Sequence, residues 1–404
     1  MSQSNGGSAD IPAELLAKGA PLGWTAEVIQ TVVASGVPLE GLEQAINAGM
    51  TPEVAARFAA GPPPLDLGWM KVPTEWGIRV RPGKHGLRMH ELNVGTYADI
   101  PDVWQNQTEM PRGAFAIEGV TAMGYSVYEK QELWADNAGE LYEEAIQRRW
   151  SPAVDVPWAS LEPLPDDIER AICQICTELS ERGLLVVDVL GKWLPDLSYG
   201  YHEVKTLLAT QIFEGGRAFE VFRKRALANG GGLGLQSPGI FSRAIFDARN
   251  FSEMSVLLHI LHTTQTLVFY KVLGRYAHNE AESTIFRYGL QDAGRHLAYG
   301  MEHLRFMLNK RPDRRAEMHT YLQRGEQMLE LDWQKDTPLR EALAIVIGGG
   351  VSNINEGLDK LGWLRKMQVE HYLAALDYGR LIDRREKLSA PFRQYLEEPQ
   401  AVPA

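Results

Sequence analysis

The apolar residues of this chain recur every three or four positions from about Trp134 to Tyr395, which is the period of a helix that buries one face. The pattern predicts helices over residues 137–149, 166–194, 201–228, 251–276, 282–309, 312–331 and 338–387, the last interrupted near residues 348–350. The second to fifth of these are long, and long helices with one apolar stripe pack into bundles. The sequence therefore predicts a mainly α protein whose body, residues 136–395, is a helical bundle.

The first 60 residues follow a different pattern. Short helical stretches alternate with Gly-Pro breaks at residues 19–21, 36–38, 49–52 and 61–62, after ten residues that are predicted to be disordered. The spacing predicts a small three-helix module, with Thr25 and Thr51 as N-caps. Such a module either docks on another molecule or packs as an appendage, and the sequence leaves both possibilities open.

Residues 61–135 are predicted to form a linker and an extended arm. Gly61 and the three prolines that follow it are typical of a stiff linker. Turn and strand signals come next, with weak helical periodicity and three of the ten tryptophans, at positions 69, 76 and 104. Because tryptophan is enriched in the cores of interfaces, we expect the arm to wrap the body or a partner.

Composition excludes several classes of function. A net charge of −11 argues against nucleic acid or an anionic membrane as the partner. No wholly apolar run reaches the roughly 18 residues that span a bilayer, and the first residues lack a basic segment followed by an apolar one, so no secretory signal is expected. Only two cysteines, Cys173 and Cys176, are present, which predicts a cytoplasmic protein.

One acidic phrase occurs twice in the predicted bundle. Residues 214–218 read Glu-Gly-Gly-Arg-Ala, and residues 292–296, which begin 78 positions later, read Asp-Ala-Gly-Arg-His. Both copies run acidic, small, Gly, Arg and then a fifth residue. A repeat at this interval predicts two copies of a helix pair within the bundle.

Further phrases accompany the repeat, at residues 141–145 (Leu-Tyr-Glu-Glu-Ala), 209–211 (Ala-Thr-Gln) and 219–232. With them, residues 139–310 resemble the ferritin-like, ribonucleotide-reductase-like diiron oxygenases of bacteria. In that family each half of a four-helix bundle supplies a lone Glu and a Glu-x-x-His to a pair of iron ions. The resemblance implies a ferritin-like bundle here, and a diiron cofactor would be expected of it.

The resemblance also assigns six ligand positions, most of which lack a ligand. They are Gly183, Gly215 and Ala218 in the first half, and Thr263, Ala293 and His296 in the second. Carboxylates are needed to neutralise two iron ions in a bundle core, and one imidazole among small residues cannot do so. We therefore expect no metal and no other cofactor in this chain.

The same positions predict what replaces the metal. An unfilled void would cost stability, so Phe213 or Tyr270 is expected to lean into the vacated space. His296 is expected to be a core histidine held by one hydrogen bond. The charged residues of the two phrases are expected to form structural cross-helix salt bridges: Glu214, Arg217, Asp292 and Arg295.

Other candidate sites are weaker. The two cysteines are three positions apart in one helix with no second pair, so small core residues are favoured over a zinc or redox site. His259 and His262 are also three apart and could bind metal with Glu302 or His303, but no carboxylate-rich segment accompanies them. The three glycines at 348–350 are not followed by Lys and Ser or Thr, which argues against a phosphate loop.

Three functions remain open at this point. The first is a non-catalytic, metal-free subunit that partners and stabilises a catalytic diiron monooxygenase subunit. The expected assembly is a hetero-oligomer with a diiron-bearing relative, and a homodimer is the alternative. The second is an enzyme that uses the emptied bundle centre, with acid–base groups drawn from His296, Tyr299, Glu302 and His303. The third is a small-molecule binding protein built on the same emptied centre.

Overall fold

The computed structural model describes residues 11–59, 65, 67–71, 77–107, 112–115 and 123–397. The chain divides into two compact units, residues 1–76 and 77–404. The predicted disordered start and the prolines of the predicted linker lie outside the described residues. The described part of the predicted arm from Gly77 onward belongs to the second unit.

The described residues of the first unit form four short α-helices, so the prediction of three was wrong. They are α1 (Ala13–Gly19), α2 (Ala26–Ala34), α3 (Leu39–Asn47) and α4 (Pro52–Ala59). Three Gly-Pro breaks separate four segments, and the seven residues of α1 are too few to show a clear period. Thr25 caps α2 as predicted, because its hydroxyl accepts a hydrogen bond from the Val28 N–H at 3.2 Å. Buried Trp24 and Ile29 lie at the centre of the unit's small core.

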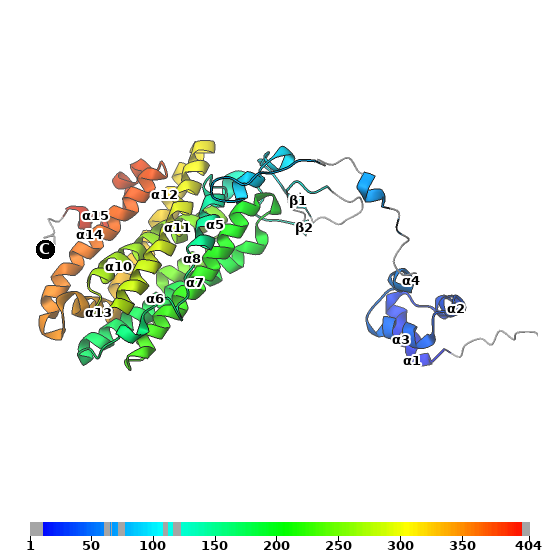
Figure 1. Ribbon diagram of the computed structural model, residues 1–404, viewed down its shortest axis with the longest axis horizontal. Helices are drawn as coiled ribbons and strands as arrows, with labels where there is room; N and C mark the ends of the chain where they lie inside the picture. The colour runs from blue at the N-terminus through cyan, green and yellow to red at the C-terminus, as the bar shows by residue number, and fades with distance from the viewer. Residues whose placement is uncertain are drawn as a thin grey trace, which may run out of the picture. The chain divides into compact units, whose positions relative to one another are not determined.

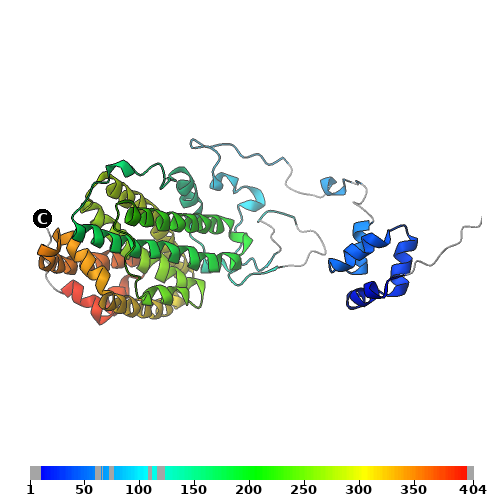
Figure 2. The same cartoon turned by 90° about the horizontal axis from the view of Figure 1, so that it is seen from below.

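Four long helical segments run side by side in the second unit (Figures 1 and 2). They are α6 (Asp166–Trp193), α7 (His202–Ala228), the continuous stretch Phe251–Arg275, and α11 (Glu280–Lys310). α6 packs along the length of α7, and α10 (Thr263–Arg275) packs along α11. The two helix pairs together form a helical bundle, and the mainly α fold predicted from the pattern is confirmed.

The remaining elements surround these four segments. The helices are α5 (Ala138–Gln147), α8 (Ile240–Phe246), α12 (Arg315–Lys335), α13 (Thr337–Gly348), α14 (Ile354–Tyr378) and α15 (Ala390–Glu397). Two short antiparallel strands, β1 (Asn106–Gln107) and β2 (Met123–Gly124), pair in the arm. α13 packs on α6, and α14 packs on both α10 and α13.

Two predicted helices are interrupted in the structure. The stretch Phe251–Arg275 consists of α9 (Phe251–Ser255), a π-helical segment (Val256–His262) and α10. The stretch predicted over 338–387 breaks at Gly349 and Gly350, which have positive φ angles of 81° and 126°. It then ends at Tyr378, nine residues before the predicted end, where Arg380 adopts a φ of 69° and a 3₁₀ turn follows over Ile382–Lys387.

The described arm residues of the second unit are anchored to the bundle. Arg112 is almost fully buried, and its guanidinium donates to the Gly200 carbonyl at 2.7 Å and to the Glu203 carboxylate at 3.1 Å. The Met89 N–H donates to Glu143 in α5 at 2.8 Å. These bonds hold the arm against α5 and the start of α7.

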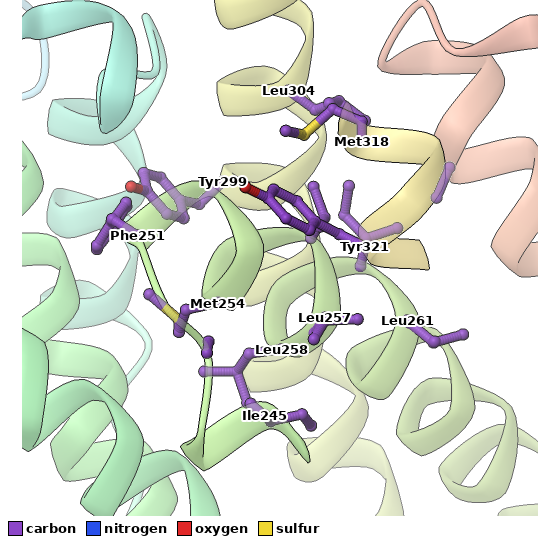
Figure 3. Close-up of a cluster of buried hydrophobic side chains, with 14 of the residues drawn as sticks. Ile245, Phe251, Met254, Leu257, Leu258, Leu261, Tyr299, Leu304, Met318 and Tyr321 are labelled. Carbon is purple, nitrogen blue, oxygen red and sulfur yellow. The ribbon is translucent and has the colours of Figure 1, made fainter. Parts of the chain in front are cut away.

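The core continues from one helix pair to the other. Figure 3 shows part of it, where side chains of the π-helical segment, α11 and α12 meet around Leu257, Tyr299 and Met318. Among the described helices, Phe251–Arg275 is long and apolar enough by composition to cross a membrane, but 89% of its most apolar window is buried inside the protein. Such burial is typical of a central core helix.

Candidate functional site

The first helix pair is in backbone contact at two of the six predicted ligand positions. A Cβ atom at Gly183 in α6 would lie 2.6 Å from the Phe219 nitrogen and 2.7 Å from the Gly215 oxygen in α7. A Cβ at Gly215 would lie 2.8 Å from the Gly183 oxygen. Any side chain at either position would push the two backbones apart, so a glutamate ligand cannot be accommodated there in this packing.

All six predicted ligand positions nevertheless border one cavity, of about 50 Å³, at the centre of the bundle. Tyr270 also lines it, as expected for a bulky residue that fills vacated space. The alternative, Phe213, was wrong: this side chain is 61% exposed. Residue 213 lies on the outer face of α7, two positions from the inward-facing Gln211 and therefore about 200° around the helix.

A buried ion-pair network stands beside this cavity. Arg217 in α7 pairs with Asp292 in α11 at 2.5 Å, and Arg295 in α11 pairs with Glu214 in α7 at 2.5 Å. Arg295 also bonds to Asp292 within its own helix. The four charged residues of the repeated phrases thus form reciprocal bridges between the two helix pairs, with one Arg and one carboxylate from each copy.

Two further side chains complete the network. The ring Nε2 of His296 lies 2.8 Å from the second carboxylate oxygen of Glu214. The indole N–H of Trp150, which follows α5 in the chain, donates to Asp292 at 2.9 Å, and Arg217 donates to the Trp150 carbonyl at 3.2 Å. Sequence reasoning missed Trp150, because nothing in the local pattern after the end of a helix marks a residue that contacts another helix pair.

The electrostatics of the two carboxylates differ. Burial would raise the pKa of Glu214, but the hydrogen bond and charge of His296 and the charge of Arg295 outweigh it, and that pKa is lowered. Burial and the neighbouring Glu214 charge raise the pKa of Asp292, against the opposing effect of Arg217 and Arg295. Burial would lower the pKa of Arg295, but the charges and hydrogen bonds of Glu214 and Asp292 raise it.

The residues present do not fit a diiron cofactor. Both carboxylates at the centre are already neutralised by guanidinium groups, and the hydroxyl of Thr263 donates to the Leu258 carbonyl at 2.8 Å. Among the residues that the structure describes, no group of three or more His, Cys, Asp or Glu side chains is placed to hold a metal ion. Here guanidinium groups balance the negative charge of the carboxylates, as metal ions do in metal-binding helical bundles.

The two histidines of the π-helical segment differ in their hydrogen bonding. His259 lies 3.1 Å from the Ser255 hydroxyl and 3.0 Å from the Gln211 side chain, so both ring nitrogens are paired. His262 lines the central cavity, is 4% exposed and has no hydrogen-bond partner at either ring nitrogen among the residues that the structure describes. Burial and the nearby Arg182 charge lower the pKa of His262, so the ring is neutral.

The other candidate acid–base groups are engaged away from the cavity. The Tyr299 hydroxyl donates to the Leu133 carbonyl at 2.8 Å, and Glu302 accepts from Arg305 at 2.9 Å. His303 lies 3.1 Å from the Trp134 carbonyl, and burial lowers its pKa to about 4. Of the four groups considered, only His296 borders the cavity.

The two cysteines are free and buried in the core. Burial and the Glu169 carboxylate raise the pKa of Cys173 to about 12, and burial also raises the pKa of Cys176. Neither thiol is therefore set up as a nucleophile or a metal ligand.

Comparisons with known proteins were made at three levels. No family model matches the chain, and no curated protein matches it. Among solved structures, the chain is similar to an R2-like ligand-binding oxidase with a Mn/Fe cofactor, at 15% identity, covering 62% of this chain and 94% of that chain, with a TM-score of 0.37. A mutant of such an oxidase matches at 15% identity, covering 63% of this chain and 98% of that chain, with a TM-score of 0.39.

Proposed function

We propose that this protein is a metal-free ferritin-like subunit that partners and stabilises a catalytic, metal-bearing monooxygenase subunit. One observation carries the proposal: the centre of the bundle holds two reciprocal Arg–carboxylate bridges where the repeated phrases of the resembled family supply metal ligands. The scaffold, its internal repeat and the convergence of the six positions on one cavity are retained. The chemistry that needs a metal is replaced by charge pairing.

The network supports a structural role on energetic grounds. Each buried guanidinium must be matched by a carboxylate, because removing one partner of a buried pair costs about 3–5 kcal/mol. Here Glu214, Asp292, Arg217 and Arg295 balance in charge and connect α7 to α11. Such a network holds two helix pairs in a fixed register, which suits a subunit that positions a neighbour.

The outer face of α7 supports a partner. Phe213 and Leu227 on this helix are more than half exposed, and Val154 in the nearby loop is 79% exposed. A groove of about 630 Å³ lies along the last turns of α7, with Leu227, Phe219 and Trp158 in its lining. Exposed apolar side chains gathered on one face mark protein–protein contact sites.

The central cavity argues against the small-molecule alternative. Ligand pockets measure about 300–1,000 Å³, whereas this cavity is about 50 Å³. The cavity has room for a few water molecules and none for an organic substrate. The emptied bundle centre therefore offers no substrate site.

Affinity purification from the organism that encodes the chain tests the proposed partnership. The tagged full-length protein is expected to recover, in near-equal amount, a second ferritin-like chain with intact Glu-x-x-His motifs, and the metal in the complex is expected to follow the amount of that chain. Replacing Phe213 and Leu227 by serine should reduce its recovery, whereas Leu331→Ser, on α12, should not. Recovery of this chain alone, as a monomer or homo-oligomer, would refute the proposal.

A further inference from the structure

A surface cleft lies between α6 and the segment that leads into α8. It measures about 640 Å³, which is the size of a small-molecule pocket. One wall comes from α6, between Glu178 and Asp188, and the other from residues 236–239 and from α8 with its following residue, up to Asp247. The cleft is separate from the central cavity and from the groove on α7.

A small recess of about 20 Å³ adjoins the cleft. Glu178, Arg182, Ser237 and Ser242 line both spaces. Arg182 stands at the junction: its Nε donates to Glu178 at 2.7 Å, and its guanidinium lies over the Phe269 ring at 4.9 Å. His262 borders the recess from the inside.

The ring of His262, which borders both this recess and the central cavity, is available to a hydrogen-bonding group. Its ring is buried, and neither nitrogen has a partner in the described residues. A buried polar group without a partner destabilises the fold, so such groups in proteins are matched by a ligand or by ordered water. The neutral imidazole offers one donor and one acceptor to the recess.

The charges around the cleft and recess do not balance. Six carboxylates line the two spaces but only three guanidinium groups: Glu178, Glu181, Asp188, Asp247, Asp332 and Asp336 against Arg182, Arg243 and Arg365. Of the three guanidinium groups, only Arg182 forms an ion pair within the described part of the chain. Burial, followed by the charges of Glu178 and Asp336, raises the pKa of Glu181 to about 7.

Three of the carboxylates have no cationic partner among the described residues. These are Glu181, Asp188 and Asp247, which face the cleft from both of its walls. Glu181 accepts one hydrogen bond, from the Ser237 N–H at 3.2 Å. The apolar part of the lining comes from Leu184, Leu185 and Phe246. The walls therefore combine carboxyl groups that form no ion pair among the described residues with an apolar strip.

We propose that the cleft between α6 and α8 is a binding site for a small organic cation, an aliphatic diamine. One ammonium group pairs with the unpaired carboxylates of the cleft, and the methylene chain lies along the apolar strip. The second amine bonds toward the recess that His262 borders. An anion is disfavoured by the excess of carboxylates, and the described residues contain no three-ligand group for a metal ion.

Calorimetric titration of the full-length protein tests this site. Putrescine is expected to bind saturably, and butanediol, which has hydroxyls in place of the ammonium groups, is expected not to bind. Glu181→Gln and Asp247→Asn should each weaken putrescine binding by at least about tenfold. Glu370→Gln, which removes an exposed, unpaired carboxylate of α14, is the matched control and should leave binding unchanged.

Each outcome decides the proposal. Circular dichroism establishes that each variant is folded, and the exposed Asp247 provides a variant whose folding is not in question. Absence of saturable binding, equal binding of putrescine and butanediol, or equal losses in the Glu370→Gln control would overturn the assignment. Loss of binding on removal of Glu181 and Asp247 alone would establish it. The result is independent of whether the chain pairs with an oxidase subunit.

Discussion

The two helix pairs of the bundle pack differently at the predicted ligand positions. In the pair α6–α7 the ligand positions are glycines, and the two backbones touch at Gly183 and Gly215. In the pair α10–α11 the corresponding positions, Thr263 and Ala293, keep their side chains and border open space. The second pair makes its close contacts at other positions along the helices, where Gly289 packs against Tyr270 and Gly300 packs against His259.

This difference shows that the two helix pairs accommodate small residues at the predicted ligand positions in different ways. The backbones of the first pair are in contact, so its packing requires glycine. The predicted ligand positions of the second pair border a cavity that Tyr270 also lines. The ion-pair network joins α7 of the first pair to α11 of the second.

Removal of one charge from the network is expected to have the largest effect. Asp292→Asn leaves Arg217 without its close carboxylate partner and should lower the free energy of unfolding by about 3–5 kcal/mol. Chemical denaturation measures the change. The control is Glu356→Gln, which breaks an ion pair of the exposed Glu356 with Lys360 and should cost no more than about 1 kcal/mol. Similar costs for the two variants would show that the network is not a structural bridge.

A second buried ion pair also connects α7 to α11, at another position along the two helices. Glu282 in α11 bonds to Arg225 in α7 at 2.8 Å. Burial would raise its pKa, but bonds from His278 and the charge of Arg225 lower it to about 2 from a usual value of 4.5. A depressed pKa stabilises the fold above pH 4.5, and this contribution is lost as the pH falls from 4.5 toward 2.

Glu282→Gln should therefore lower the free energy of unfolding by about 3 kcal/mol at pH 7, and its difference from the parent protein should become smaller below pH 4.5. Chemical denaturation of both proteins at pH 7, 5 and 3 measures this difference. A difference that stays constant over this range would contradict the assigned role of the carboxylate.

Glycine substitutions in α6 test the closure of the first pair. Gly183→Ala places a Cβ 2.6 Å from the Phe219 nitrogen and should destabilise the protein by about 1–3 kcal/mol. Gly191→Ala, two turns later in the same helix, meets nothing within 4 Å and should stabilise by up to about 1 kcal/mol. If both variants shift stability in the same direction, the two backbones are not in contact at Gly183.

The matching substitution in the second pair should have the smallest effect. Ala293→Val adds two methyl groups beside the central cavity, so we expect stability to change by less than about 1 kcal/mol. Thermal unfolding of this variant and of Gly183→Ala, measured together, compares the two pairs directly. Equal destabilisation by both would remove the distinction between a closed pair and an open one.

Much of the architecture could be predicted because helical periodicity is local. The bounds of α6 and α7 differ from the predicted ones by no more than a residue, since long apolar stripes mark both helices and a run of glycines follows α7. The π-helical segment could not be predicted, because its hydrogen-bond shift leaves the apolar content unchanged. α8 is too short, at seven residues, to show a period.

The site was predicted in part for a similar reason. The repeated phrases identify the charged residues of the network, because their types and spacing are visible in the chain. The pairing of Trp150 with Asp292 and the isolation of His262 depend on contacts between distant segments, which no local pattern records. The carboxylates of the α6–α8 cleft were not singled out, because no local pattern distinguishes them from the many other carboxylates of the chain.

Elemental analysis tests the central claim most directly. The full-length protein is produced in medium supplied with iron and manganese, purified without chelators, and its metal content is measured per chain. Because the centre is neutralised by Arg217 and Arg295, we expect far less than one metal ion per chain. A content of about two ions per chain, as in the metal-bearing bundles, would contradict the replacement of the metal by the ion-pair network.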